Sequence, residues 1–90
     1  MSIIKDYIHQ INESCGKHRN FIVILRSNKK DEAIRKILLK TEEKIFDSPL
    51  FTKIKIKNKE VNIYRTGKIL IKNMEGKEEL EKFLEEILKD

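Results

Sequence analysis

The sequence predicts an α+β fold, a two-layer sandwich with helices on one face of a four-stranded antiparallel sheet. Three observations predict it. Residues 51–73 hold three short segments in which aliphatic and polar residues alternate, as in strands that bury one face. Other segments place aliphatic residues at helical spacing. Ninety residues with 39% hydrophobic content suit a single domain, which we place at 1–90. The predicted order is α-β-α-β-β-β-α.

The first predicted helix and strand lie before residue 28. Residues 3–14 are predicted to be helical, with Gly16 after the helix end, so residues 1–16 form an N-terminal helical extension. The residues on its apolar face are Ile4, Tyr7, Ile8 and Ile11. Residues 20–27 are rich in β-branched and aromatic residues and predict a strand. Both faces of this strand are apolar, so either the N-terminal helix or a partner is expected to cover the second face.

The second predicted helix starts at Asp31 and runs to about Ser48. Its aliphatic residues recur at helical spacing as far as Ile45. The residue before Pro49 is pushed out of helical geometry, which sets the predicted end.

Three strands and a last helix are predicted for the second half of the chain. Turns at Asn58-Lys59 and Thr66-Gly67 separate the strands. The residues predicted to face the core are Ile54, Ile56, Val61, Ile63, Ile69 and Ile71. They are expected to pack on the apolar stripe of a helix over 76–89, which consists of Leu80, Phe83, Leu84, Ile87 and Leu88.

The outward side of the predicted sheet is basic, and no predicted helix covers it. Residues 51–73 carry seven Lys or Arg residues and one Glu, a net charge of +6, whereas residues 75–90 carry a net charge of −4. Such asymmetry bears on binding partners and on electrostatic steering. A face that presents ammonium groups, an amide and an aromatic ring can hold a polyanion.

The hairpin Ile63-Tyr64-Arg65-Thr66-Gly67-Lys68 is followed by an aliphatic strand and a helix that begins with several glutamates. With the strand and helix before it, this pattern resembles one repeat of the TATA-box-binding protein family, over residues 20–88. In that family two aromatic side chains act as wedges against DNA. Phe51 and Tyr64 match those positions. The resemblance implies this fold and a sheet surface that faces DNA.

These observations predict a small non-enzymatic module that binds nucleic acid, with DNA favoured over RNA. The candidate binding residues are Arg26, Phe51, Lys53, Lys55, Lys57, Asn62, Tyr64 and Lys72. The cations would contact phosphates, and the two aromatic rings would stack on bases or wedge between them. A homodimer is expected, because two copies would rebuild the two-repeat saddle of that family.

Two alternatives stay open. The lysines can simply solvate an exposed sheet face and discourage edge pairing. The chain can also be a protein-interaction module or an accessory subunit that docks on an acidic protein.

No cofactor, metal or catalytic residue is predicted. Cys15 is the only cysteine, so an internal disulfide is excluded. His9, Cys15 and His18 are too few for a tetrahedral zinc site. No nucleophile motif or phosphate-binding glycine loop occurs. The N-terminus lacks a signal-peptide pattern, and the apolar runs are too short to span a bilayer, so we expect a cytoplasmic protein with no membrane partner.

Overall fold

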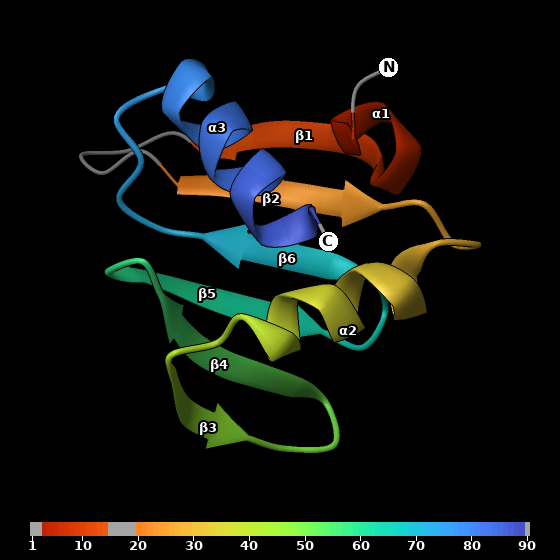
Figure 1. The fold of residues 1–90 in the computed structure, drawn as a ribbon, viewed down its shortest axis with the longest axis vertical. Helices are drawn as coiled ribbons and strands as arrows, with labels where there is room; N and C mark the ends of the chain where they lie inside the picture. The colour runs from red at the N-terminus through yellow and green to blue at the C-terminus, as the bar shows by residue number, and fades with distance from the viewer. Residues whose placement is uncertain (1–2, 15–19, 90) are drawn as a thin grey trace.

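The computed structural model describes residues 3–14 and 20–89. Within them the fold is α+β, with one antiparallel sheet of six strands in the order β1-β2-β6-β5-β4-β3 and helices on one face (Figure 1). The elements are α1 (Ile3–Tyr7), β1 (Ile8–Ser14), β2 (Asn20–Leu25), α2 (Lys30–Leu39), β3 (Glu43–Asp47), β4 (Phe51–Ile56), β5 (Lys59–Tyr64), β6 (Lys68–Ile71) and α3 (Lys77–Leu88). The predicted four-stranded sheet is therefore wrong, and the additional strands are β1 and β3.

The predicted helix over residues 3–14 stops at Tyr7, and β1 follows it directly. Ile8 pairs with Leu25 and Ile11 pairs with Val23, so both isoleucines lie on the core side of the sheet. A regular strand would put residues three apart on opposite faces. An irregularity in pairing between Ile8 and Gln10 brings them to the same face. The strand thereby acquires a spacing that is typical of a helix, which explains the error.

The predicted helix from Asp31 to Ser48 ends at Leu39, where β3 had not been predicted. Near the end, the Thr41 hydroxyl donates a hydrogen bond to the Ile37 carbonyl at 3.1 Å. β3 then pairs with β4, and the register shifts between Lys44 and Phe46. Ile45 is the extra residue, so the apolar residues of β3 do not alternate. Ile45 therefore matched the helical spacing only by coincidence.

The predicted register of residues 51–73 is confirmed. The six aliphatic residues predicted to face inward are all buried, at no more than 3% exposure. β4 pairs with β5 through Ile54 and Val61, and β5 pairs with β6 through Ile63 and Ile69. Because each strand buries alternate side chains, the other side chains lie on the face away from the helices.

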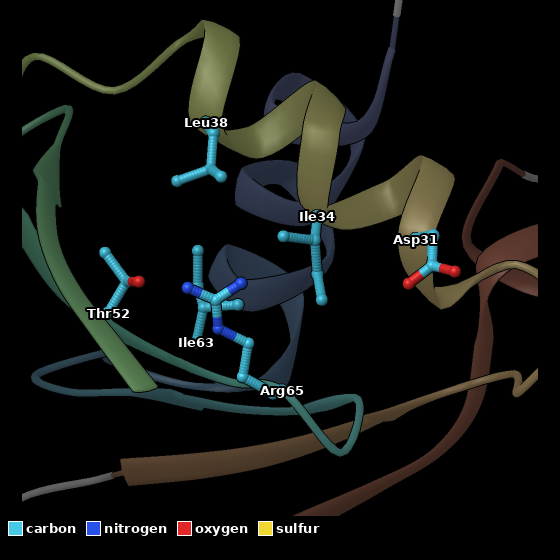
Figure 2. Close-up of a pocket in the computed structure, with 6 residues that line it drawn as sticks. All are labelled: Asp31, Ile34, Leu38, Thr52, Ile63 and Arg65. Carbon is cyan, nitrogen blue, oxygen red and sulfur yellow. The ribbon is translucent and has the colours of Figure 1, made fainter. Parts of the chain in front are cut away.

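Helix α2 covers the β4–β5 part of the sheet and leaves a small cavity beneath it. The cavity has a volume of 110 Å³ and is lined by Asp31, Ile34, Leu38, Thr52, Ile63 and Arg65 (Figure 2). Leu38 is 37% exposed, so the helix closes this end of the core incompletely.

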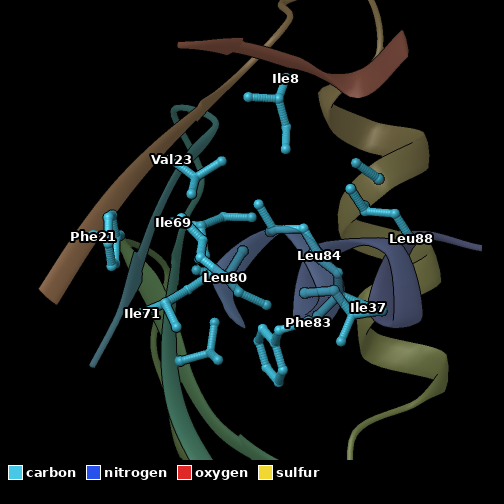
Figure 3. Close-up of a cluster of buried hydrophobic side chains, with 14 of the residues drawn as sticks. Ile8, Phe21, Val23, Ile37, Ile69, Ile71, Leu80, Phe83, Leu84 and Leu88 are labelled. Atoms are coloured by element: carbon cyan, nitrogen blue, oxygen red, sulfur yellow. The ribbon is translucent and has the colours of Figure 1, made fainter. Parts of the chain in front are cut away.

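Helix α3 covers the other half of the core. Leu80, Leu84 and Ile87 are fully buried, and Figure 3 shows α3 side chains against those of β2 and β6. This part of the core also includes Tyr7 and Ile8, so the short N-terminal helix lies on the same side of the sheet as α3. It therefore does not cover the outward face of β2.

Glu79 connects the start of α3 to the sheet. The Glu75 backbone N–H donates to Glu79 Oε2 at 2.8 Å, and Lys59 Nζ lies 3.2 Å from Glu79 Oε1. The hydrogen bond from the Glu75 N–H, followed by the contact with Lys59, lowers the pKa of the Glu79 carboxyl.

A carboxyl whose pKa is lower in the folded state than in the unfolded state stabilises the fold at pH values above the unfolded-state pKa. This stabilisation is lost as the pH falls through the folded-state pKa. The Tm of the wild type should therefore fall between about pH 5 and pH 3. Glu79→Gln should make that fall shallower, with a lower Tm at pH 7. Thermal melts across this range test the effect, and parallel curves for the two proteins would contradict it. Glu81→Gln, an exposed change on the same helix, is the control.

Candidate nucleic-acid interface

The sheet face opposite the helices, here called the open face, is defined by the strand register. Its central side chains are Ile22, Ile24, Phe46, Phe51, Lys53, Lys55, Glu60, Asn62, Tyr64, Lys68, Leu70 and Lys72. None of the helices α1, α2 and α3 lies over this face in the part of the chain that the structure describes (Figure 1). No described helix therefore separates this side of the sheet from solvent.

Three aromatic rings lie side by side on the open face, and we call them the aromatic row. Phe46 on β3, Phe51 on β4 and Tyr64 on β5 form it. The ring centroids of Phe46 and Phe51 are 5.4 Å apart, and those of Phe51 and Tyr64 are 5.3 Å apart. Phe51 is the cross-strand partner of Tyr64, which brings the two predicted wedge residues together. Because Phe46 is 51% exposed and the other two rings are half-buried, the row can contact a ligand.

A shallow hollow lies at the β3 end of the aromatic row. It has a volume of 390 Å³ and is lined by Ile45, Phe46, Phe51 and Lys53. Apolar rings with an ammonium group beside them suit a planar base that carries a phosphate.

The open-face lysines differ in their surroundings. Lys53 lies between Asn62 and Phe46 in the cross-strand direction, and Lys68 is paired with Ile24. Lys55 is the partner of Glu60, whose backbone carbonyl also accepts a hydrogen bond from the Lys72 N–H. Glu43 on β3 is the other cross-strand partner of Lys55. The carboxylates of Glu43 and Glu60 offset part of the charge of Lys55, while Lys53 and Lys68 have neutral cross-strand partners. We expect Lys53 and Lys68 to be the stronger phosphate contacts.

Most of the predicted site residues share the open face. Phe51, Lys53, Lys55, Asn62, Tyr64 and Lys72 all lie on it. Lys57 does not: β4 ends at Ile56, and Lys57 lies in the turn with a φ of 51°. Its Nζ is 3.6 Å from Glu86 on α3. Arg26 follows β2 at the rim of the sheet, where its Nε donates to the Lys5 carbonyl at 2.8 Å.

Sequence reasoning missed Phe46 and Lys68 as candidate residues. Phe46 was missed because the residues before Pro49 were predicted to be helical, so they were not assigned to a strand. Lys68 follows the glycine turn, and its alternation with Ile69 could have placed it on the outward face. The apolar residues Ile22, Ile24 and Leu70 are half-buried on the same face, so the part beside β2 is more apolar than the part beside β4.

Away from the open face, residues 3–14 and 20–89 include the cavity under α2. These residues contain no cluster of His, Cys, Asp or Glu that could hold a metal ion. Cys15 and His18 of the metal trio lie outside the described residues. The cavity under α2 has one cation at its mouth, Arg65, whose Nη2 is 3.8 Å from Asp47. No helix in the described ranges is long and apolar enough to cross a membrane.

Comparison with protein families, curated proteins and solved structures finds no match to this chain. The resemblance to the TATA-box-binding protein repeat therefore stays a prediction, and the open face itself is the basis for a function.

Proposed function

We propose that the chain is a non-enzymatic nucleic-acid-binding module and that the open face is its binding surface. The observation that carries the proposal is the aromatic row beside Lys53 and Lys68 on a sheet face that no described helix covers. Aromatic rings provide stacking surfaces for bases, and ammonium groups neutralise phosphates. The acidic helix α3 lies on the opposite side of the sheet, so the charge asymmetry would orient the module toward a polyanion.

Fluorescence anisotropy of labelled DNA and RNA, single-stranded and duplex, at two salt concentrations tests this proposal. We expect binding at low salt that weakens as salt rises, because displaced counterions return to the nucleic acid. Absence of binding to every probe at low salt would refute it. A pull-down of an acidic protein that requires Lys53 and Lys55 would then favour the interaction module.

Tyr64→Ala should weaken binding by about 1–3 kcal/mol, or roughly 5- to 150-fold, because it removes one stacking surface. The salt dependence should stay almost unchanged, since no cation is lost. Tyr64→Phe keeps the ring and is the matched control. Equal affinities for wild type and Tyr64→Ala would show that the aromatic row does not contact the ligand.

We also propose that the module functions as a homodimer. The segment 39–50, which contains β3, exposes apolar side chains: Leu39 is 80% exposed, Ile45 43% and Leu50 76%. β3 is an outer strand, so one of its edges is open to pairing. Light scattering at micromolar concentration should report a dimer, and Ile45→Lys should shift it to a monomer. A monomeric wild type would refute the dimer while leaving the binding surface untouched.

A further inference from the structure

Asn62 is a buried polar residue in the middle of the open face. It is 7% exposed, although it lies on the face that no described helix covers. Its Oδ1 is buried and accepts no hydrogen bond from any described residue. Most buried polar groups in folded proteins have such a partner, and leaving a carbonyl without one destabilises the fold. A ligand bound at this place could supply the donor that this acceptor lacks among the described residues.

The neighbours of Asn62 identify the ligand chemistry. Its cross-strand partners are Lys53 on β4 and Leu70 on β6, and Tyr64 follows two residues later on the same face. Phe51, which pairs with Tyr64, is the diagonal neighbour of Asn62, within reach of a large side chain or ring. A group bound to Asn62 would thus lie beside the aromatic row and beside the Lys53 ammonium. Nucleobases carry N–H donors on a flat ring that a phosphodiester accompanies, so they suit the Asn62 acceptor, the aromatic row and the Lys53 ammonium group together.

We propose that Asn62 reads the edge of an unpaired base in a single-stranded nucleic acid. On binding, the Asn62 amide turns outward so that its buried Oδ1 accepts an N–H of the base edge. The base then lies against the aromatic row, and Lys53 contacts the adjoining phosphate. In a duplex the Watson–Crick donors are already engaged, whereas a single strand can turn them toward a protein surface. This inference rests on the proposed function and adds single strands as the preferred ligand and Asn62 as the residue that discriminates between bases.

The test uses single-stranded oligomers of deoxyadenylate, deoxycytidylate and deoxythymidylate of about 10 nucleotides, and a mixed-sequence duplex. The wild type should bind single strands more tightly than the duplex and should differ between bases by about 5-fold or more. Asn62→Leu removes the amide and keeps a similar shape, so that difference should fall to about 2-fold or less. Asn62→Val is a second variant with a residue that suits strands.

Asn12→Leu is the matched control. Asn12 belongs to the same cross-strand row, at the edge strand β1, and its Oδ1 already accepts a hydrogen bond from Gln10 Nε2 at 2.8 Å. This variant should keep the base preference of the wild type. A second readout is stability: Asn62→Leu removes an orphaned acceptor and should raise the Tm, by about 4 °C or more, and Asn12→Leu should not.

The outcomes separate the two proposals. A base preference that survives Asn62→Leu, or equal affinity for duplex and single strands, overturns this inference and leaves the binding surface standing. A lower Tm in both Asn62 variants also overturns it, because the carbonyl would then have a partner within the fold. Absence of binding to every probe overturns the inference and the proposed function together.

Discussion

Leu84→Ala is expected to lower the free energy of unfolding by about 2–5 kcal/mol, the largest stability effect of any change considered. Leu84 is fully buried, and it lies on α3 facing the β6 side chains (Figure 3). Removing the isobutyl group loses its burial and leaves a cavity that the sheet and helix cannot fully close. Since small domains have about 5–15 kcal/mol of stability in total, the loss would be a large share.

Urea denaturation measures this change, with Glu85→Ala as the control. Glu85 is the next residue on the same helix and is exposed, so its change should stay within about 0.5 kcal/mol. Equal effects of the two substitutions would contradict the packing of α3 on the sheet.

The double change Lys53→Ala with Lys68→Ala should weaken binding of single strands by about 2 kcal/mol, or roughly 30-fold at low salt, if each ammonium contacts one phosphate. It should also reduce the slope of log affinity against log salt by about 1.4. Both lysines lie on the open face with neutral cross-strand partners, so the fold should tolerate their loss. Anisotropy titrations at several salt concentrations measure both quantities.

The control is Lys77→Ala with Lys82→Ala, which changes net charge by the same amount. Both residues are exposed on α3, on the other side of the sheet. If net charge alone attracts the nucleic acid, the two double variants should weaken binding equally, and that result would exclude the open face as the specific contact surface.

The second half of the chain could be predicted from the sequence because its strands alternate regularly. Asn58 and Gly67 occupy turns with positive φ, at 65° and 100°, and mark where the strands end. Between these turns every second residue is aliphatic, and the matching stripe of α3 fixes which face is inward. Regular alternation leaves only one register that buries all of these side chains.

The two outer strands could not be predicted, because each departs from regular alternation. Pairing shifts after Ile8 in β1 and around Ile45 in β3. In β1 the shift puts Ile8 and Ile11 on one face, a spacing of three that indicates a helix when the sequence is read alone. In β3 the shift removes the alternation that would indicate a strand, and Ile45 continues the helical spacing of α2 by coincidence. β1 and β3 are strands because they pair with β2 and β4, respectively. These pairings involve residues farther along the chain, so the local sequence pattern does not reveal them.

The candidate site was partly predictable for the same reason. Lys53, Lys55, Asn62 and Tyr64 belong to regularly alternating strands, so their shared face followed from spacing. Phe46 could be placed on the open face only once β3 was known. That Lys57 does not lie on this face could be known only from the conformation of the turn after β4. That Asn62 Oδ1 is buried with no hydrogen-bond partner among the described residues depends on the neighbouring strands that pack around it.

Mapping the contact surface by NMR tests the central claim most directly. A single-stranded oligonucleotide of about 10 nucleotides is added to uniformly ¹⁵N-labelled protein, and changes in amide chemical shift are followed. We predict that the largest changes occur at Phe46, Phe51, Lys53, Asn62 and Tyr64, with little change along α3. Changes concentrated on α3, or at the mouth of the cavity under α2, would contradict the account, because they would place the ligand on the opposite side of the sheet.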